Sequence, residues 1–208
     1  MRWSRTRIAI GAVAAIVLVL LALNVTGIAP VPTGPLGDHE PAVSDVAVTT
    51  MGHDPAGTPV YLVPVVENAG PLSATVVRVT PTGVTVPGSV EVLGSLPFDE
   101  EASSEHGSDG MDLIVLGIAL DPGPAWSTPQ PVIGVTVEPR RTEHRQGRAF
   151  LVRVTPDPAQ ETTVLLFDVE YTIGPLHFLT TAWGALGTTL VMCPRDRPVA
   201  GDDGCVAQ

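Results

Sequence analysis

The longest hydrophobic run of the chain lies close to its N-terminus. Residues 8–23 carry no charge, and the uncharged, mostly apolar stretch extends through residue 29. A helix over 8–29 would cover roughly 33 Å at about 1.5 Å per residue, enough to cross a bilayer core. Three arginines and no acidic residue precede it in residues 1–7. The positive-inside rule therefore predicts a cytoplasmic start over 1–7, a transmembrane helix over 8–29, and export of the remainder.

A cleaved signal peptide has the same charged start and apolar middle, so it stays open as the alternative. The run reaches or exceeds the usual length of such a peptide, and no clear A-x-A cleavage site follows it. We therefore expect an uncleaved signal anchor in a single-pass membrane protein with an extracytoplasmic C-terminal domain. The sequon Asn24-Val25-Thr26 falls at the edge of this span, where we interpret it as a chance match.

Residues 30–45 contain four prolines and two glycines with little hydrophobic periodicity. This composition predicts a semi-rigid spacer that lifts the following domain off the bilayer. From residue 24 onward the chain has 8 arginines (11 minus the 3 at the N-terminus) against 22 acidic residues, a net charge of −14. Such a domain repels anionic lipid headgroups, and its charge argues against nucleic-acid binding.

From about residue 46 the hydrophobic pattern changes to short segments rich in β-branched residues, separated by Gly or Pro. The clearest is 164–173, where Phe167, Val169 and Tyr171 alternate with polar residues, as in a strand with one buried face. Gly174-Pro175 then predicts a turn into the next strand. The expected strands are 60–66, 74–80, 112–120, 132–137, 149–155, 164–173, 176–183 and 187–192.

No exported segment shows a sustained helical period, whereas strands recur every 8 to 15 residues or so. This spacing predicts an all-β protein, a single antiparallel sandwich over residues 46–193. The five residues VRVTP occur at both 77–81 and 152–156. We interpret this repeat as chance or a shared strand-to-turn solution, in preference to two tandem sandwiches.

Two blocks carry a resemblance. Residues 63–79, VPVVENAGPLSATVVRV, resemble the strand, Asn-x-Gly, Thr-Val-x-x-Val signature of immunoglobulin-like domains in exported bacterial proteins. Residues 169–174, VEYTIG, with the following strand, are similar to the terminal hairpin of uncharacterised membrane-anchored proteins of actinobacterial type. The resemblance implies an immunoglobulin-like sandwich after one transmembrane helix, and it brings no catalytic residues. We expect Asn68 and Gly70 to tolerate positive φ and so permit the turn between two core strands.

An acidic segment is the first candidate for chemistry. Its acids alternate with Ser and Gly, and hard oxygen ligands in a loop suit calcium, but the regular D-x-D-x-D-G spacing is absent. We therefore prefer a solvated loop and keep calcium binding as the alternative. Copper is a weaker metal hypothesis, resting on Met51 and His53. The acidic candidates are Asp99, Glu100, Glu101, Glu105, Asp109 and Asp112.

An arginine-rich segment, expected as an exposed loop between two strands, is the second candidate. It could pair with the acidic loop or grip an anionic partner such as a cell-wall polymer or lipid headgroup; a solvated loop is the preferred interpretation. Its members are Arg140, Arg141, Arg145 and Arg148.

No catalytic constellation is recognisable, and the five histidines are scattered, so we expect neither an enzyme nor a cofactor. Cys193 and Cys205 are predicted to form a disulfide that pins the tail 194–208, because exported domains are oxidised. The leading hypothesis is a membrane-anchored, non-catalytic interaction module, binding a cell-surface protein or an anionic cell-wall polymer. A metal-binding or sensing sandwich is second and an enzyme third.

Overall fold

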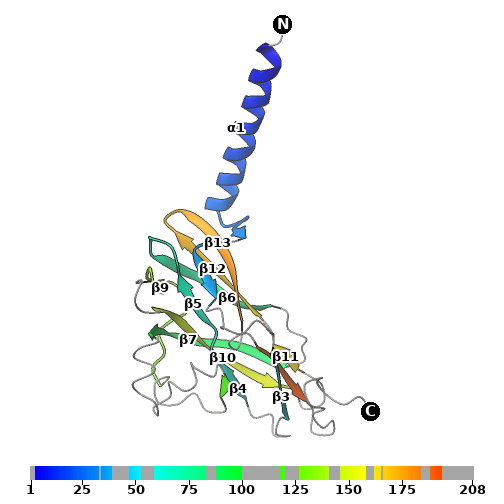
Figure 1. Cartoon of the computed structure of the whole chain (residues 1–208), viewed down its shortest axis with the longest axis vertical. Helices are drawn as coiled ribbons and strands as arrows, with labels where there is room; N and C mark the ends of the chain where they lie inside the picture. Colours follow the sequence, from blue (N-terminus) through cyan, green and yellow to red (C-terminus); the bar gives the residue numbers. More distant parts are fainter. Residues whose placement is uncertain are drawn as a thin grey trace.

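A computed structural model gives the architecture. It describes residues 3–32, 34–38, 47–52, 59–82, 88–99, 118–119, 127–140, 146–157, 162–164, 166–183 and 188–193. Within these ranges the chain forms one helix, α1 (Trp3–Val25), followed only by β-strands. The helix extends away from the strands, which together form the body of the molecule (Figure 1). The expectation of an all-β domain is therefore confirmed.

The first sheet has the strand order β1-β13-β12-β6-β9. Its neighbours are antiparallel except for β1 and β13, which run parallel. The strands are β1 (Val31–Pro32), β6 (Ala74–Thr82), β9 (Thr136–Val137), β12 (Leu166–Ile173) and β13 (Leu176–Trp183).

The second sheet is built around β10, whose two edges both carry partners. β7 pairs along one edge, while β5 and β4 pair with successive parts of the other; β2 then pairs with β5 and β8 with β4. All of these pairs are antiparallel. The strands are β2 (Leu36–Asp38), β4 (Val60–Leu62), β5 (Val65–Asn68), β7 (Gly88–Asp99), β8 (Ile118–Ala119) and β10 (Gln146–Pro156).

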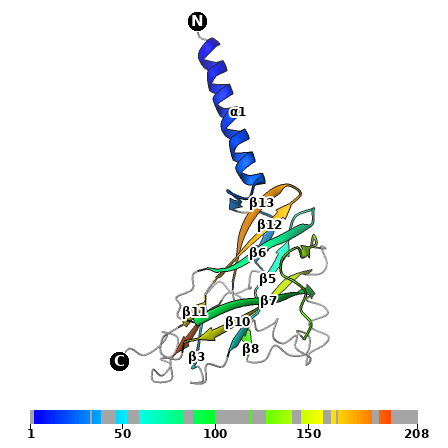
Figure 2. The same ribbon diagram turned by 180° about the vertical axis from the view of Figure 1, so that it is seen from behind.

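A smaller third sheet, β11-β14-β3, lies at the end of the body farthest from α1 (Figure 1 and Figure 2). Here β14 pairs antiparallel with β11 but parallel with β3. The sequence pattern alone predicted antiparallel pairing, so the two parallel strand pairs in the described part of the chain, β1 with β13 and β3 with β14, differ from it. The strands are β3 (Ala47–Gly52), β11 (Thr162–Val164) and β14 (Thr188–Cys193).

The main core lies between the first two sheets. Val76, Val169 and Tyr171 of the first sheet meet Val66 and Phe150 of the second, and all five are 0% exposed. A second cluster joins the same sheets to β14, and a third covers the other face of β10. The two VRVTP segments lie one in each facing sheet, in β6 and β10. They therefore belong to one packed unit, not to two tandem sandwiches.

The predicted hairpin is confirmed in detail. Phe167, Val169 and Tyr171 of β12 are buried, whereas the residues between them are partly exposed. The register Ile173↔Leu176 leaves a two-residue turn in which Gly174 has φ 57°. Glycine adopts this left-handed conformation without steric cost, which explains why the turn begins there.

β7 is the long strand that the hydrophobic pattern did not predict. Gly94, Ser95 and Pro97 interrupt its apolar residues, yet it pairs with β10 over nearly its whole length. A Cβ on Gly94 would lie 2.4 Å from Pro129, so the small residue admits a crossing segment. Glycine and proline are tolerated in β7 because only one of its two edges pairs along its length, with β10.

The N-terminal region differs from expectation in two ways. The helix begins at Trp3 and ends at Val25, so residues 26–29 do not belong to it. The spacer expected over 30–45 is partly built into the sheets, because β1 and β2 lie within it and Leu36 is only 1% exposed. Proline-rich composition did not prevent pairing, since both strands are short and lie at sheet edges. The described residues include no helix whose length and apolar character suffice to span a membrane.

Candidate functional site

The end of α1 is closed by a Schellman motif. Ile28 N–H donates to the Leu23 carbonyl at 3.0 Å, and Gly27 N–H donates to the Asn24 carbonyl at 2.8 Å. Gly27 has φ 72°, the left-handed conformation that this motif requires. The chain therefore leaves the helix in a fixed direction, two residues after Val25.

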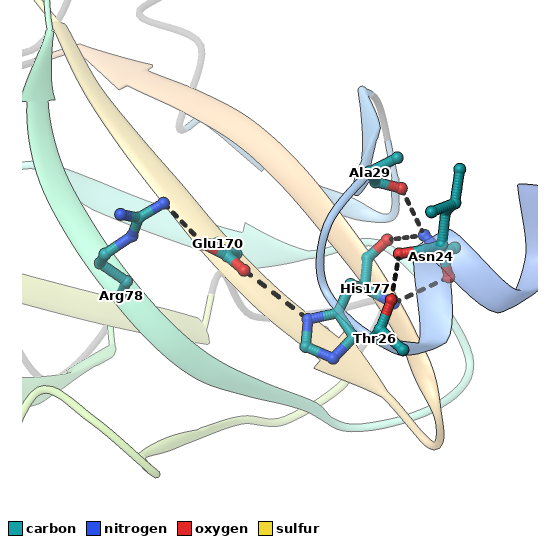
Figure 3. A network of polar contacts seen from close by, with 7 residues as sticks. Asn24, Thr26, Ala29, Arg78, Glu170 and His177 are labelled. Carbon is teal, nitrogen blue, oxygen red and sulfur yellow. Dashed lines mark hydrogen bonds and ion pairs between the residues drawn. The ribbon is translucent and has the colours of Figure 1, made fainter.

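Asn24 joins the last turn of the helix to β13 (Figure 3). Its Nδ2 donates to the His177 carbonyl at 2.6 Å and to the Ala29 carbonyl at 3.2 Å, while its Oδ1 accepts from His177 N–H at 3.1 Å. The side chain is 5% exposed. Both backbone groups of His177 are thus satisfied by one side-chain amide, an arrangement we call the asparagine clamp. The interpretation of the sequon as a chance match stays a prediction.

Beside the clamp, the side chains of His177, Glu170 and Arg78 follow one another across the strands of the first sheet (Figure 3). Arg78 of β6 donates to Glu170 of β12 at 2.9 Å. The other oxygen of Glu170 lies 3.6 Å from His177 Nδ1, a buried atom with no hydrogen-bond partner. Gly27 packs over the imidazole, since a Cβ there would lie 3.2 Å from Cε1. The backbone groups of His177 therefore have hydrogen-bond partners, whereas its side-chain Nδ1 has none.

The arrangement, which we call the joint, holds the end of α1 against β13. Its strongest contacts use backbone groups and a neutral amide, which transfer no proton. The carboxylate of Glu170 is already engaged by Arg78. Within the described residues, no set of three His, Cys, Asp or Glu side chains could hold a metal ion.

Asn68 has a structural role, but by a different mechanism from the expected positive φ. It is fully buried; its Nδ2 donates to the carbonyls of Leu72 and Val137, and its Oδ1 accepts from Gly70 N–H at 2.9 Å. Gly70 does not have positive φ. It is needed because a Cβ would lie 2.6 Å from Pro35. The turn is therefore made by a side-chain amide and a close approach.

The arginine-rich segment is divided by the structure. Arg140 pairs with Glu67 at 3.3 Å and keeps about half of its side chain exposed (48%). Arg148 lies inside β10, 8% exposed, and donates to Gln130 at 2.7 Å. The expectation that Arg148 belongs to an exposed loop is wrong, because the strand begins at Gln146. Arg141 and Arg145 lie outside the described residues.

Burial also lowers the pKa of Arg148, because a charged guanidinium loses its hydration between the strands. Its Nε is buried without a partner. Arg148 therefore makes its contacts inside the protein, and most of its side chain is inaccessible to a partner that binds the surface.

The candidate metal ligands cannot be assembled from the described part of the chain. Asp99 ends β7, and Met51 lies in β3 opposite Met192. His53 and the remaining acidic candidates lie outside the described residues; these are Glu100, Glu101, Glu105, Asp109 and Asp112.

Cys193 ends β14, is 0% exposed and is not a free thiol. Cys205 lies outside the described residues, so the pairing of the two cysteines stays a prediction. The tail 194–208 lies there as well.

The residues that sequence reasoning missed are those of the joint. Asn24 and His177 are 153 positions apart, and no local pattern connects them. The available signal was the single polar amide at the end of an apolar run. Comparisons with protein-family models, with curated proteins and with solved structures find no match to this chain.

Proposed function

We propose that this chain is a membrane-anchored, non-catalytic interaction module, with α1 in the bilayer and the β-domain outside the cytoplasm. The observation that carries the proposal is the surface of α1. Its six successive residues 16–21 are all Ile, Val or Leu and are between 47% and 66% exposed. At 100° per residue, six positions go once and a half around the helix. A helix that is apolar all round needs an apolar environment.

The energy of that surface supports a lipid environment. Burying a Val, Leu or Ile side chain fully is worth about 1.5–3 kcal/mol, so burying the exposed half of six is worth roughly 5–9 kcal/mol. The side chains of α1 are described without a gap over residues 12–25, about 21 Å of helix. The sequence is uncharged back to residue 8, which brings the apolar length to about 27 Å, close to a bilayer core. The arginines of residues 1–7 favour the cytoplasmic side for the N-terminus.

For the domain, we propose a variant of the immunoglobulin-like sandwich. The order β2-β5-β10-β7 supports it, because this is the order of strands A, B, E and D in that fold. The order β6-β12-β13 likewise matches strands C, F and G, and the two sheets share a core. The third sheet would be an addition at the end far from α1.

The anchor is tested by alkaline extraction of membranes from cells that make the full chain. We expect the wild type to stay in the membrane pellet. Val17→Arg with Leu18→Arg should move it to the supernatant, since each central arginine costs about 2.5–3.5 kcal/mol of insertion. Thr80→Arg, on an exposed strand position, is the matched control and should stay in the pellet. A wild type that is extracted like a soluble protein would exclude the anchor.

The interaction role is tested by capture of partners from native membranes. Because Arg148 is buried, the variant should carry Arg140→Ser, Arg141→Ser and Arg145→Ser and leave Arg148 in place. A cell-surface protein or anionic cell-wall polymer that binds the wild type and not this variant would support the arginine-rich segment as its site. Binding retained in the variant would exclude that segment.

A further inference from the structure

The end of the β-domain next to α1 is made of three short segments. These are residues 26–32, which leave the helix, residues 69–73, which precede β6, and residues 174–176, the β12–β13 turn. In the sheet register, Thr172 of β12 lies opposite both His177 of β13 and Thr75 of β6. The end of β12 and the starts of β6 and β13 are therefore at the same level of the sheet. β6 and β13 are two strands apart, about 10 Å. We call the three segments together the collar.

The collar contains no charged residue and no histidine. This is notable in a chain where 16% of the residues are charged and the net charge is −11. Its exposed apolar side chains include Ile28 (72%), Leu72 (61%) and Val31 (41%). Pro71 and Pro175 are exposed as well. Charged side chains border it: exposed Glu138 accepts from Ser73 at 2.6 Å, and Arg140, paired with Glu67, donates its N–H to the Asn68 carbonyl at 2.7 Å.

The clamp prevents this end from turning away from the helix axis. Asn24 fixes β13 to the last turn of α1, and Gly27 fixes the exit of the chain. Strand β1 then pairs with Phe178 and Leu179 within six residues of the helix end. No free spacer separates the helix from the sheets, so the collar must lie where the helix enters its surroundings.

We propose that the collar is a membrane-contact surface that seats the domain directly on the lipid headgroup region, with Leu72 and Ile28 inserted among the headgroups. This inference rests on the proposed anchor and replaces the stand-off domain that the spacer predicted. The contact energy of an uncharged apolar surface comes from the apolar area that it buries and not from attraction to charged headgroups. The contact therefore forms on zwitterionic lipid and does not depend on salt.

The test uses the full chain reconstituted into phosphatidylcholine vesicles that carry a spin label on some headgroups. Leu72→Cys and Pro175→Cys place an environment-sensitive fluorophore on two collar segments, in unreduced protein so that Cys193 does not react. Thr80→Cys is the matched control, because Thr80 is exposed on β6, the strand that follows the first site, and lies about 26 Å farther along the chain. We expect strong quenching and a blue shift at both collar sites, equal at low and high salt, and neither at Thr80.

Each other result overturns the inference in a recognisable way. If the protein floats with the vesicles but neither collar label is quenched, the domain stands off the membrane and the anchor survives. If the protein does not float with them, the anchor fails and the collar inference fails with it. If quenching disappears at high salt, the contact is electrostatic. If a label responds to protein density and not to spin-labelled lipid, the collar binds a second copy of the chain.

Discussion

The asparagine clamp should control how firmly the helix is held to the sheet, and Asn24→Ala removes it. The change deletes the bond from Asn24 Nδ2 to the His177 carbonyl (2.6 Å) and the bond from His177 N–H to Oδ1 (3.1 Å). Each such bond has a net value of about 1 kcal/mol, so the joint loses about 2 kcal/mol. Opening of the joint should become about 30-fold more frequent, since every 1.4 kcal/mol is tenfold.

Amide hydrogen exchange measures this opening directly. We would follow peptides that cover residues 174–180 by mass spectrometry, with the full chain in detergent micelles. Exchange at His177 should accelerate about 30-fold in Asn24→Ala. Asn24→Asp places a buried carboxylate oxygen against the His177 carbonyl, so it should accelerate exchange at least as much as Asn24→Ala.

Thr26→Val is the matched control. Thr26 is exposed, and its hydroxyl donates to the Ala22 and Leu23 carbonyls without touching β13. It should alter exchange at the helix end and leave His177 unchanged. Exchange at His177 within about threefold of wild type in Asn24→Ala would refute the reasoning, because the joint would then be worth less than about 0.7 kcal/mol.

Three further predictions concern the domain. Tyr171→Phe should lower the free energy of unfolding by about 1–3 kcal/mol, because Leu36 N–H loses its acceptor. Burial raises the pKa of Tyr171, so the stability it contributes is present below about pH 10 and lost above it; thermal melts from pH 8 to 11 or so should fall less steeply in the variant. Gly174→Ala should cost about 1 kcal/mol in urea melts because of its φ of 57°. Finally, Cys193 and Cys205 should resist alkylation in unfolded, unreduced protein and react only after reduction.

Each of these has a result that would contradict it. A melting curve unchanged by Tyr171→Phe would mean that water satisfies Leu36 N–H. Stability gained in Gly174→Ala would mean that the turn relaxes to negative φ. Two alkylated thiols in unreduced protein would exclude the disulfide.

The parts of the fold that could be predicted from sequence are those in which side-chain periodicity coincides with burial. β12 is the clearest example, because one of its faces lies in the core and the other is wet. β10 could be predicted only in part, since residues 148–152 are buried on both faces and show no alternation. β7 was not predicted because Gly94 and Pro97 interrupt its apolar pattern. Gly94 makes room for the segment that crosses at Pro129, and Pro97 lies at the strand edge, so neither contributes to the core. Hydrophobic periodicity therefore predicts a strand where one face is buried. It gives no signal where both faces are buried or where backbone contacts determine the pairing.

The spacer prediction is wrong for residues 31–32 and 36–38, for a related reason. Proline and glycine indicate that a segment cannot form a long strand, and β1 and β2 are two and three residues long. They are held by contacts with distant residues: β1 by Phe178 and Leu179, and Leu36 by the hydroxyl of Tyr171. Composition limits the length of an element but does not decide whether a short one pairs.

Asn24 and Asn68 show the same physical solution at two places, and together they explain why the joint was invisible in the sequence. Each is buried, and each uses one amide to accept from a backbone N–H and to donate to two backbone carbonyls. An unsatisfied buried backbone group costs about 1–3 kcal/mol, so a buried amide that satisfies two of them is strongly constrained in position. Both residues sit in common local motifs, a glycosylation sequon and an Asn-x-Gly turn, that have simpler interpretations. What distinguishes them is the distant segment they bind, and that information resides in the tertiary fold.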